Sequence, residues 1–236
     1  MDLITEGLEK IVNWMPALLL AARTTLLLTV FSVSTALVLG VFLALGKISR
    51  NPFISKPCTA YIFFFRGTPL LIQLFIVYFG LPLIYSGFDV GRLPFADPTS
   101  FLFHPRFIAA YIAFSLNIAA YLAEIIRAAI QSIDKGQMEA SRSLGLTYGQ
   151  AMRLVIIPQS YRRMIPPVCN EFVMVLKDTA LVSIIALNDL AFQMKMIMSN
   201  SASALVILPA CVIYLLLTWI FTTVFGRLEK KLSVYE

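Results

Sequence analysis

The chain has 236 residues, of which 59% are hydrophobic and only 14% are charged. Because soluble globular domains have about 25% charged residues, this composition excludes an ordinary soluble protein and favours one that lies in a membrane. The formal net charge is +6. Lysines and arginines gathered on one side of a membrane account for such an excess, so the charge gives no reason to expect a nucleic acid partner.

Long uncharged stretches recur along the chain, at residues 24–46, 67–88, 107–123 and 199–226. A helix needs roughly 20 apolar residues to cross the hydrocarbon core, since each residue rises about 1.5 Å, so each stretch predicts a spanning helix. Residues 166–188 form a fifth, largely apolar stretch, whose charges Glu171, Lys177 and Asp178 must face protein or water. Residues 5–14 predict a separate short helix at the membrane interface.

We therefore predict an all-α, polytopic membrane protein with about five transmembrane helices, in a single domain over residues 1–236. Five crossings place the two termini on opposite sides of the membrane. Lysine and arginine are concentrated at one set of helix ends, with eleven there against four at the other set. The positive-inside rule then places the N-terminus outside and the C-terminus in the cytoplasm, which makes residues 132–165 the longest cytoplasmic loop.

This loop contains the most specific motif of the sequence. Residues 138–144 favour a short helix, and they lie between Gly136 and Gly145, two residues of the type that commonly ends helices. Glu139 falls in the first turn, where a negative charge suits the helix dipole. A short helix that lies outside the membrane and is held at both ends is suited to docking on a partner. An ordinary basic interfacial loop would show a similar pattern.

The loop resembles the "EAA" loop of ABC importer permeases. Four residues match that pattern at the right spacing, namely Glu139, Ala140, Gly145 and Pro158. Three neighbours depart from it but keep size or apolar character, namely Ser141, Val155 and Ile157. Residues 65–73, 120–127 and 176–181 resemble the polar amino acid branch, which includes the histidine, arginine, glutamine and cystine permeases. Together these matches cover most of residues 17–230.

The resemblance implies a transport machine of several parts in a bacterial plasma (inner) membrane. Two permease subunits, either identical or paired with a sister chain, form the translocation pathway. Two cytoplasmic ABC ATPase subunits dock on the permease loops around Glu139, and an extracytoplasmic substrate-binding protein delivers the amino acid. The permease itself is then no enzyme and needs no cofactor, because the partner ATPase binds ATP and Mg.

Residue patterns for catalysis are missing from the sequence. His104 is the only histidine, and the three cysteines, at positions 58, 169 and 211, have no metal-ligand spacing. Residues 40–47 are only faintly similar to a phosphate loop. Five residues separate the two glycines where four are needed, and Ile48 stands where a serine or threonine should be. Neither a metal site nor an ATP site is therefore expected in this chain.

Charges inside the fourth of the five predicted spans point to a substrate site. Glu171 and Asp178 are seven residues apart, so they share one helix face and are separated by about 10.5 Å of rise. Lys177 could bind the carboxylate of an amino acid, and the two acids could bind ammonium or guanidinium groups. The related arginine-type permeases place their substrate near this stretch. The alternative is that Lys177 and Asp178 stabilise helix packing by pairing with other intramembrane charges, for example Arg66 or Glu124.

Two further charged positions have open interpretations. Arg66 lies beside Gly67 and Pro69, which break the second span, and it could line the exit path or anchor the helix near the cytoplasmic interface. Glu124 and Arg127 are i, i+3 neighbours, a spacing that predicts a structural ion pair.

The charge count also indicates a substrate class. Lys177 and one acid balance a zwitterionic backbone, which leaves one carboxylate for a cationic side chain, so we predict arginine, lysine, histidine or a related guanidino compound. One alternative is an EAA-type permease for another small solute, such as methionine. A second is a membrane receptor or scaffold that binds an ATPase without moving solute.

Overall fold

The computed structural model describes residues 2–84, 89–94 and 96–232, and these residues form helices and connecting turns. In chain order the helices are α1 (Asp2–Ile48), α2 (Pro52–Gly67), α3 (Leu70–Phe75), η1 (Ile76–Gly80), α4 (Leu81–Ile84), η2 (Val90–Arg92), α5 (Pro105–Gln131), α6 (Lys135–Ser143), α7 (Tyr148–Ala151), η3 (Met152–Ile156), α8 (Ile157–Asp178), η4 (Thr179–Ile185), α9 (Leu190–Ser201), η5 (Ala204–Val206) and α10 (Ile207–Leu232). The elements η1 and η3 are π-helical, whereas η2, η4 and η5 are 3₁₀ helices.

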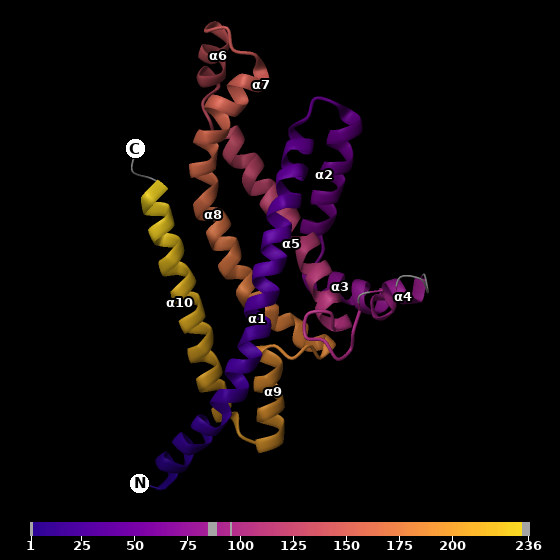
Figure 1. Cartoon of the computed structure of the whole chain (residues 1–236), viewed down its shortest axis with the longest axis vertical. Helices are drawn as coiled ribbons and strands as arrows, with labels where there is room; N and C mark the ends of the chain where they lie inside the picture. Colours follow the sequence, from indigo (N-terminus) through magenta and orange to yellow (C-terminus); the bar gives the residue numbers. More distant parts are fainter. Residues whose placement is uncertain (1, 85–88, 95, 233–236) are drawn as a thin grey trace.

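Three helical segments are long and apolar enough to cross a membrane, namely Thr5–Ile48, Pro105–Gln131 and Ala204–Lys231. The bent pair formed by α2 and Leu70–Ile84 supplies a fourth if it is one span. Helix α8 lies beside α5 and α10 along the bundle (Figure 1). Its five charged residues set it apart from the apolar helices. The all-helical, polytopic class is confirmed, and α8 stays the predicted fifth crossing.

Helix α1 is longer than the sequence predicts. It runs unbroken from Asp2 to Ile48, so the prediction of a separate helix over residues 5–14 is wrong. Trp14 and Met15 pack against a buried cluster that joins α1 to α9 and α10, and this cluster includes Leu18 and Leu190. Burial of these side chains continues the apolar stripe of the span toward the N-terminus, so nothing in the packing ends the helix there.

The second predicted span, residues 67–88, is also not one helix. The chain turns by 103° between α2 and α3. Pro69 disfavours the helical conformation at the residue before it, and Thr68 is extended with φ −119° and ψ 143°. The apolar helix on the near side of the bend is α2, which begins at Pro52. The last residues of the predicted span, 85–88, lie outside the described residues.

Helix α5 forms the centre of the bundle and packs against α1, α2, α3 and α8. Its buried face is rich in alanine, with Ala109, Ala110, Ala113, Ala119, Ala120 and Ala123. Small residues allow helix axes to approach closely. On α1, a Cβ at Gly40 would lie only 3.0 Å from the Cβ of Leu122, so glycine at this position lets α1 pass close to α5.

The two ends of the bundle carry different elements (Figure 1). Helices α6 and α7 and the turn between α1 and α2 lie at one end, which we call the loop end. The N-terminus of the chain and α9 lie at the opposite end. Helix α10 begins near α9 and runs toward the loop end, so the termini lie toward opposite ends, as an odd number of crossings requires. Which end faces the cytoplasm stays a prediction.

Candidate functional site

The predicted coupling loop forms two short helices at the loop end. Helix α6 begins at Lys135, three residues before the predicted start, because the side chain of Asp134 accepts a hydrogen bond of 2.6 Å from the backbone N–H of Gly136. Gly136 therefore lies in the first turn of α6 and does not precede the helix, which corrects the predicted boundary. Glu139 and Ala140 lie on this helix, and both are exposed.

Gly145 ends α6 as the sequence predicts. Its φ is +85°, in the left-handed region that favours glycine. The N–H of Leu146 donates to the carbonyl of Ser141 at 3.2 Å, and the N–H of Gly145 donates to the carbonyl of Arg142 at 3.0 Å. These two bonds form a Schellman motif, which satisfies carbonyls that the helix leaves free. The chain then turns sharply into the capping box of Thr147, which starts α7.

The loop end exposes apolar side chains that no other described element covers. Leu144 is 84% exposed and Leu154 is 62% exposed. Pro158 lies in the first turn of α8, directly after the π-helical residues Met152–Ile156, and it is also exposed. Large exposed apolar groups beside an exposed helix are typical of a protein docking surface. The four predicted coupling residues are thus all exposed.

A cavity of about 420 Å³ lies between the α2–α3 bend, α5 and α8. Among its lining residues are Arg66, Glu171 and Asp178, together with Asn117 and Tyr121 of α5. Three of the four predicted substrate residues therefore meet in one space, and we call it the central cavity. Lys177 does not line it, since its side chain is exposed on another face of α8.

Two buried amides hold the bend that forms one wall of the central cavity. The side-chain amide of Gln73 donates to the carbonyls of Phe65 and Thr68, both at 3.0 Å, and to the Thr68 hydroxyl at 2.7 Å. Asn117 donates to the carbonyl of Phe65 and to the side-chain oxygen of Gln73, both at 3.0 Å. Backbone groups freed at a break inside a membrane must find partners within the protein. These amides supply them.

Sequence reasoning missed the role of Asn117 and Gln73. Gln73 stands in the stretch 65–73 that resembles the family, and Asn117 is the one amide within the apolar stretch 107–123. A buried amide in a spanning segment usually has a specific hydrogen-bonding role, so it was a usable signal.

Glu124 of α5 is the meeting point of several charges near the central cavity. Its carboxylate lies 2.8 Å from Lys47 Nζ, 2.8 Å from Arg127 Nε and 3.8 Å from Arg66 Nη1. The predicted Glu124–Arg127 ion pair is confirmed. Lys47 was not predicted as a partner, because it lies 77 residues away in sequence.

Lys177 and Asp178 were alternatively interpreted as members of ion pairs that stabilise helix packing. Neither residue forms an ion pair with Arg66, Glu124 or any other side chain in the described ranges. Within one chain, packing ion pairs therefore do not account for these two charges.

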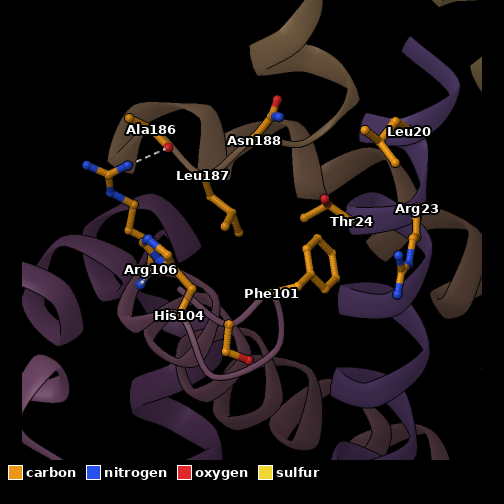
Figure 2. A pocket seen from close by; sticks show the side chains of 10 residues that line it. Leu20, Arg23, Thr24, Phe101, His104, Arg106, Ala186, Leu187 and Asn188 are labelled. Carbon is orange, nitrogen blue, oxygen red and sulfur yellow. Dashed lines mark hydrogen bonds between the residues drawn. The ribbon is translucent and has the colours of Figure 1, made fainter. Parts of the chain in front are cut away.

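A second cavity, of about 260 Å³, lies between α1, the start of α5 and the turn before α9 (Figure 2). Arg23 lies with its guanidinium 4.9 Å from the centre of the Phe101 ring, and Arg106 donates to the carbonyl of Ala186 at 3.2 Å. Nδ1 of His104 accepts the backbone N–H of Arg106. Partial burial and the nearby Arg106 guanidinium lower the pKa of His104, which favours the neutral imidazole. None of the predicted site residues lines this cavity.

Comparison with known families decides the assignment. The model of the family "Binding-protein-dependent transport system inner membrane component" matches residues 36–234. The chain belongs to this family of transport permeases. The match covers α2 to α10 and the last part of α1, residues 36–48, so the loop end, the bend and the central cavity all lie within it.

Several characterised permeases are similar over nearly their whole length. The arginine transport system permease protein ArtQ of Bacillus subtilis (strain 168) is 40% identical over 222 residues, which is 92% of this chain and 93% of that protein. The glutamine transport system permease protein GlnP of Escherichia coli (strain K12) is 32% identical over 93% of this chain and 94% of its own length. The L-cystine transport system permease protein TcyL of Bacillus subtilis (strain 168) is 34% identical over 96% of this chain and 91% of its own.

Solved structures share the fold. A crystal structure of an amino acid ABC transporter with histidines superposes with a TM-score of 0.83 at 36% identity, covering 94% of this chain and 97% of that one. The MetNI methionine ABC transporter in an inward facing conformation gives a TM-score of 0.74 at 19% identity over 93% of this chain and 97% of its own. The second likeness shows the fold alone.

Family membership confirms the main predictions from sequence. The protein is a permease subunit of a binding-protein-dependent amino acid ABC importer and a multi-pass protein of a bacterial inner membrane. It is not the catalytic subunit, and ATP binds to the partner ATPase. An ATPase and a substrate-binding protein are therefore its partners in transport. The alternative of a receptor or scaffold that moves no solute is set aside.

Proposed function

We propose that this permease moves polar amino acids through the central cavity and prefers those with a cationic side chain. The observation that carries the proposal is the charge of the cavity lining, with one cation, Arg66, and two acids, Glu171 and Asp178. A cationic amino acid has one carboxylate and two cationic groups, which is the complementary set. The similarity to ArtQ, named as an arginine permease, supports this class, while GlnP and TcyL indicate that neutral substrates also occur among relatives.

In this proposal Arg66 receives the substrate carboxylate, and the two acids receive its ammonium and side-chain cation. Lys177 was predicted to bind the carboxylate, but its side chain faces away from the cavity of its own chain. An exposed charge on a membrane helix costs on the order of 3 kcal/mol, so it needs a protein or water partner. We therefore assign Lys177 to the side of the pathway that faces the second permease subunit, where it can reach a passing substrate.

The loop end is assigned to coupling. Two ATPase subunits dock on the α6 helices of two permease subunits, which are identical or sister chains, through Glu139, Ala140, Gly145 and Pro158. The exposed apolar side chains of the loop end support such docking. ATP binding to the docked ATPases then biases an equilibrium between inward and outward conformations of the permease.

Transport by the reconstituted complex with its binding protein and ATPase tests the substrate assignment. The Glu171→Gln variant should take up L-arginine about tenfold less efficiently, equivalent to about 1.4 kcal/mol, because it loses a cation-binding carboxylate. Uptake of L-glutamine should change little. Glu9→Gln is a matched control, since Glu9 is an exposed acid at the far N-terminal end of α1. An unchanged preference for arginine over glutamine in Glu171→Gln would contradict the proposal.

A further inference from the structure

Three cationic side chains from three helices converge on the single carboxylate of Glu124. Lys47 of α1 lies 2.8 Å and 3.1 Å from its two oxygens, and Arg127 of α5 lies 2.8 Å from Oε2. Arg66 of α2 is the third cation, at 3.8 Å from Oε1, which is an ion pair but too long for a hydrogen bond. The cluster has a surplus of two positive charges, so one cation can leave without exposing a lone carboxylate.

Arg66 is the cation that can leave at the lowest cost. After its departure each oxygen of Glu124 still has a short contact, with Lys47 on Oε1 and Arg127 on Oε2. The Arg66 side chain is 43% exposed, compared with 23% for Lys47 and 27% for Arg127. Among these three cations it alone lines the central cavity.

The surroundings of Arg66 give its guanidinium a second place to bind. It lies 5.4 Å from the centre of the Tyr121 ring, a cation–π contact that can steady the guanidinium while its partner changes. Helix α2 ends at the next residue, Gly67, and an added Cβ there would meet nothing within 4 Å. Arg66 therefore lies at a helix end with open space beside it. On the cavity side, Arg66 and Glu171 line the same space, so an acid lies across the central cavity from the guanidinium.

We propose that Glu124 is a positioning residue for transport, which holds Arg66 at the rim of the central cavity and releases it to the carboxylate of an amino acid that enters. Glu124 also keeps Arg66 from binding Glu171, which would block the carboxylate site and the ammonium site together. The inference rests on the proposed function, because it assumes that amino acids bind in this cavity. Glu124 itself does not line the cavity, but through Lys47 and Arg66 it connects substrate binding to the C-terminal ends of α1 and α2.

Displacement of labelled L-arginine from the purified permease–ATPase complex in lipid nanodiscs tests this exchange. Unlabelled L-arginine should displace the label at least tenfold better than L-arginine amide, which lacks the carboxylate. In Glu124→Gln, we expect Arg66 to move to Glu171, so the affinity for L-arginine should fall about tenfold. The ratio of the affinity for L-arginine to that for L-arginine amide, called here the acid-to-amide ratio, should then approach one. The double variant Glu124→Gln/Glu171→Gln should recover that ratio, because Arg66 is free again. A merely structural role of Glu124 would weaken both ligands equally and would not be rescued by removing a second charge.

A second variant keeps the test decisive if Glu124→Gln fails to assemble. Arg127→Gln leaves Glu124 with only Lys47 and Arg66, so Arg66 is held more tightly and the acid-to-amide ratio should fall several-fold. Glu6→Gln is the matched control, because it removes an exposed ion pair with Lys10 far from the cavity and should leave the ratio unchanged. Two results would contradict the inference. One is that the variant that assembles prefers L-arginine over L-arginine amide as strongly as the wild-type complex does. The other is that the wild-type complex itself shows no preference between the two ligands. A wild-type complex that binds no amino acid would instead contradict the proposed function.

Discussion

At the scale of single residues, the central cavity depends on side-chain amides that donate hydrogen bonds to the backbone carbonyls left free at the α2–α3 bend. Gln73 is only 3% exposed, and its amide donates to three acceptors around the bend. The residue types in the motif 65–73 predicted the break at Gly67 and Pro69. They did not identify Asn117, which reaches the same carbonyl from a helix 52 residues away. Contacts between distant segments leave no periodic signal in one sequence. The family resemblance therefore identified the motif 65–73, but its partner Asn117 could be found only from the fold.

Replacing Gln73 with methionine should show how much these bonds stabilise the bend. Methionine keeps the length of the side chain but donates no hydrogen bond, so the carbonyl of Thr68 and the side chain of Asn117 lose a partner. We expect a loss of about 1–3 kcal/mol in stability, measured as a lower midpoint in thermal unfolding of the detergent-solubilised permease. The matched control is Gln193→Met on α9, where the half-buried glutamine side chain makes no hydrogen bond with a described residue. Equal midpoints for the two variants would show that the bend is held by packing instead.

At the scale of elements, the sequence predicted the positions of the apolar helices better than their ends. Hydropathy located α1, α5 and α10, because long apolar runs have few other uses. It separated residues 5–14 from α1, since Glu6, Glu9 and Lys10 interrupt the apolar pattern while the helix continues through them. The predicted start of α6, at residue 138, is three residues late. It was placed from the flanking glycines, whereas the hydrogen bond accepted by the side chain of Asp134 begins the helix at Lys135. Helix boundaries are thus set by individual hydrogen bonds that average properties do not capture.

The conformation of Gly145 gives a prediction at this scale. A residue with a Cβ costs about 1–2 kcal/mol in the left-handed region, and a β-branched residue costs more, so Gly145→Val should distort the end of α6. We expect the variant to insert into the membrane normally but to lose substrate-stimulated ATP hydrolysis by the partner ATPase. Gly149→Ala is the matched control, since Gly149 lies in α7 without a positive φ and with open space around it. Wild-type stimulation in Gly145→Val would remove this loop from coupling.

At the scale of the whole molecule, the proposed coupling surface and the proposed substrate site are built from different elements of the bundle. The exposed surface of α6 lies at the loop end. The ion pairs of Glu124 with Lys47, Arg66 and Arg127 connect α5 to the C-terminal ends of α1 and α2. The central cavity lies between the bend and α8, and α8 leads directly from it to the coupling loop. Motion of α6 by a docked ATPase can therefore reach the acids of the cavity through one continuous helical segment, from Met152 to Asp178. The sequence predicted both ends of this connection, but not that Lys177 faces away from the cavity.

The most direct test of the account is a cryo-EM structure of the assembled permease–ATPase complex with L-arginine bound. The account predicts ligand density in the central cavity, with the carboxylate beside Arg66 and the cationic groups beside Glu171 and Asp178. The Arg66 guanidinium should lie farther from Glu124 than the 3.8 Å found here. Ligand density in the cavity of Figure 2, or in the central cavity with the carboxylate turned away from Arg66, would contradict the account.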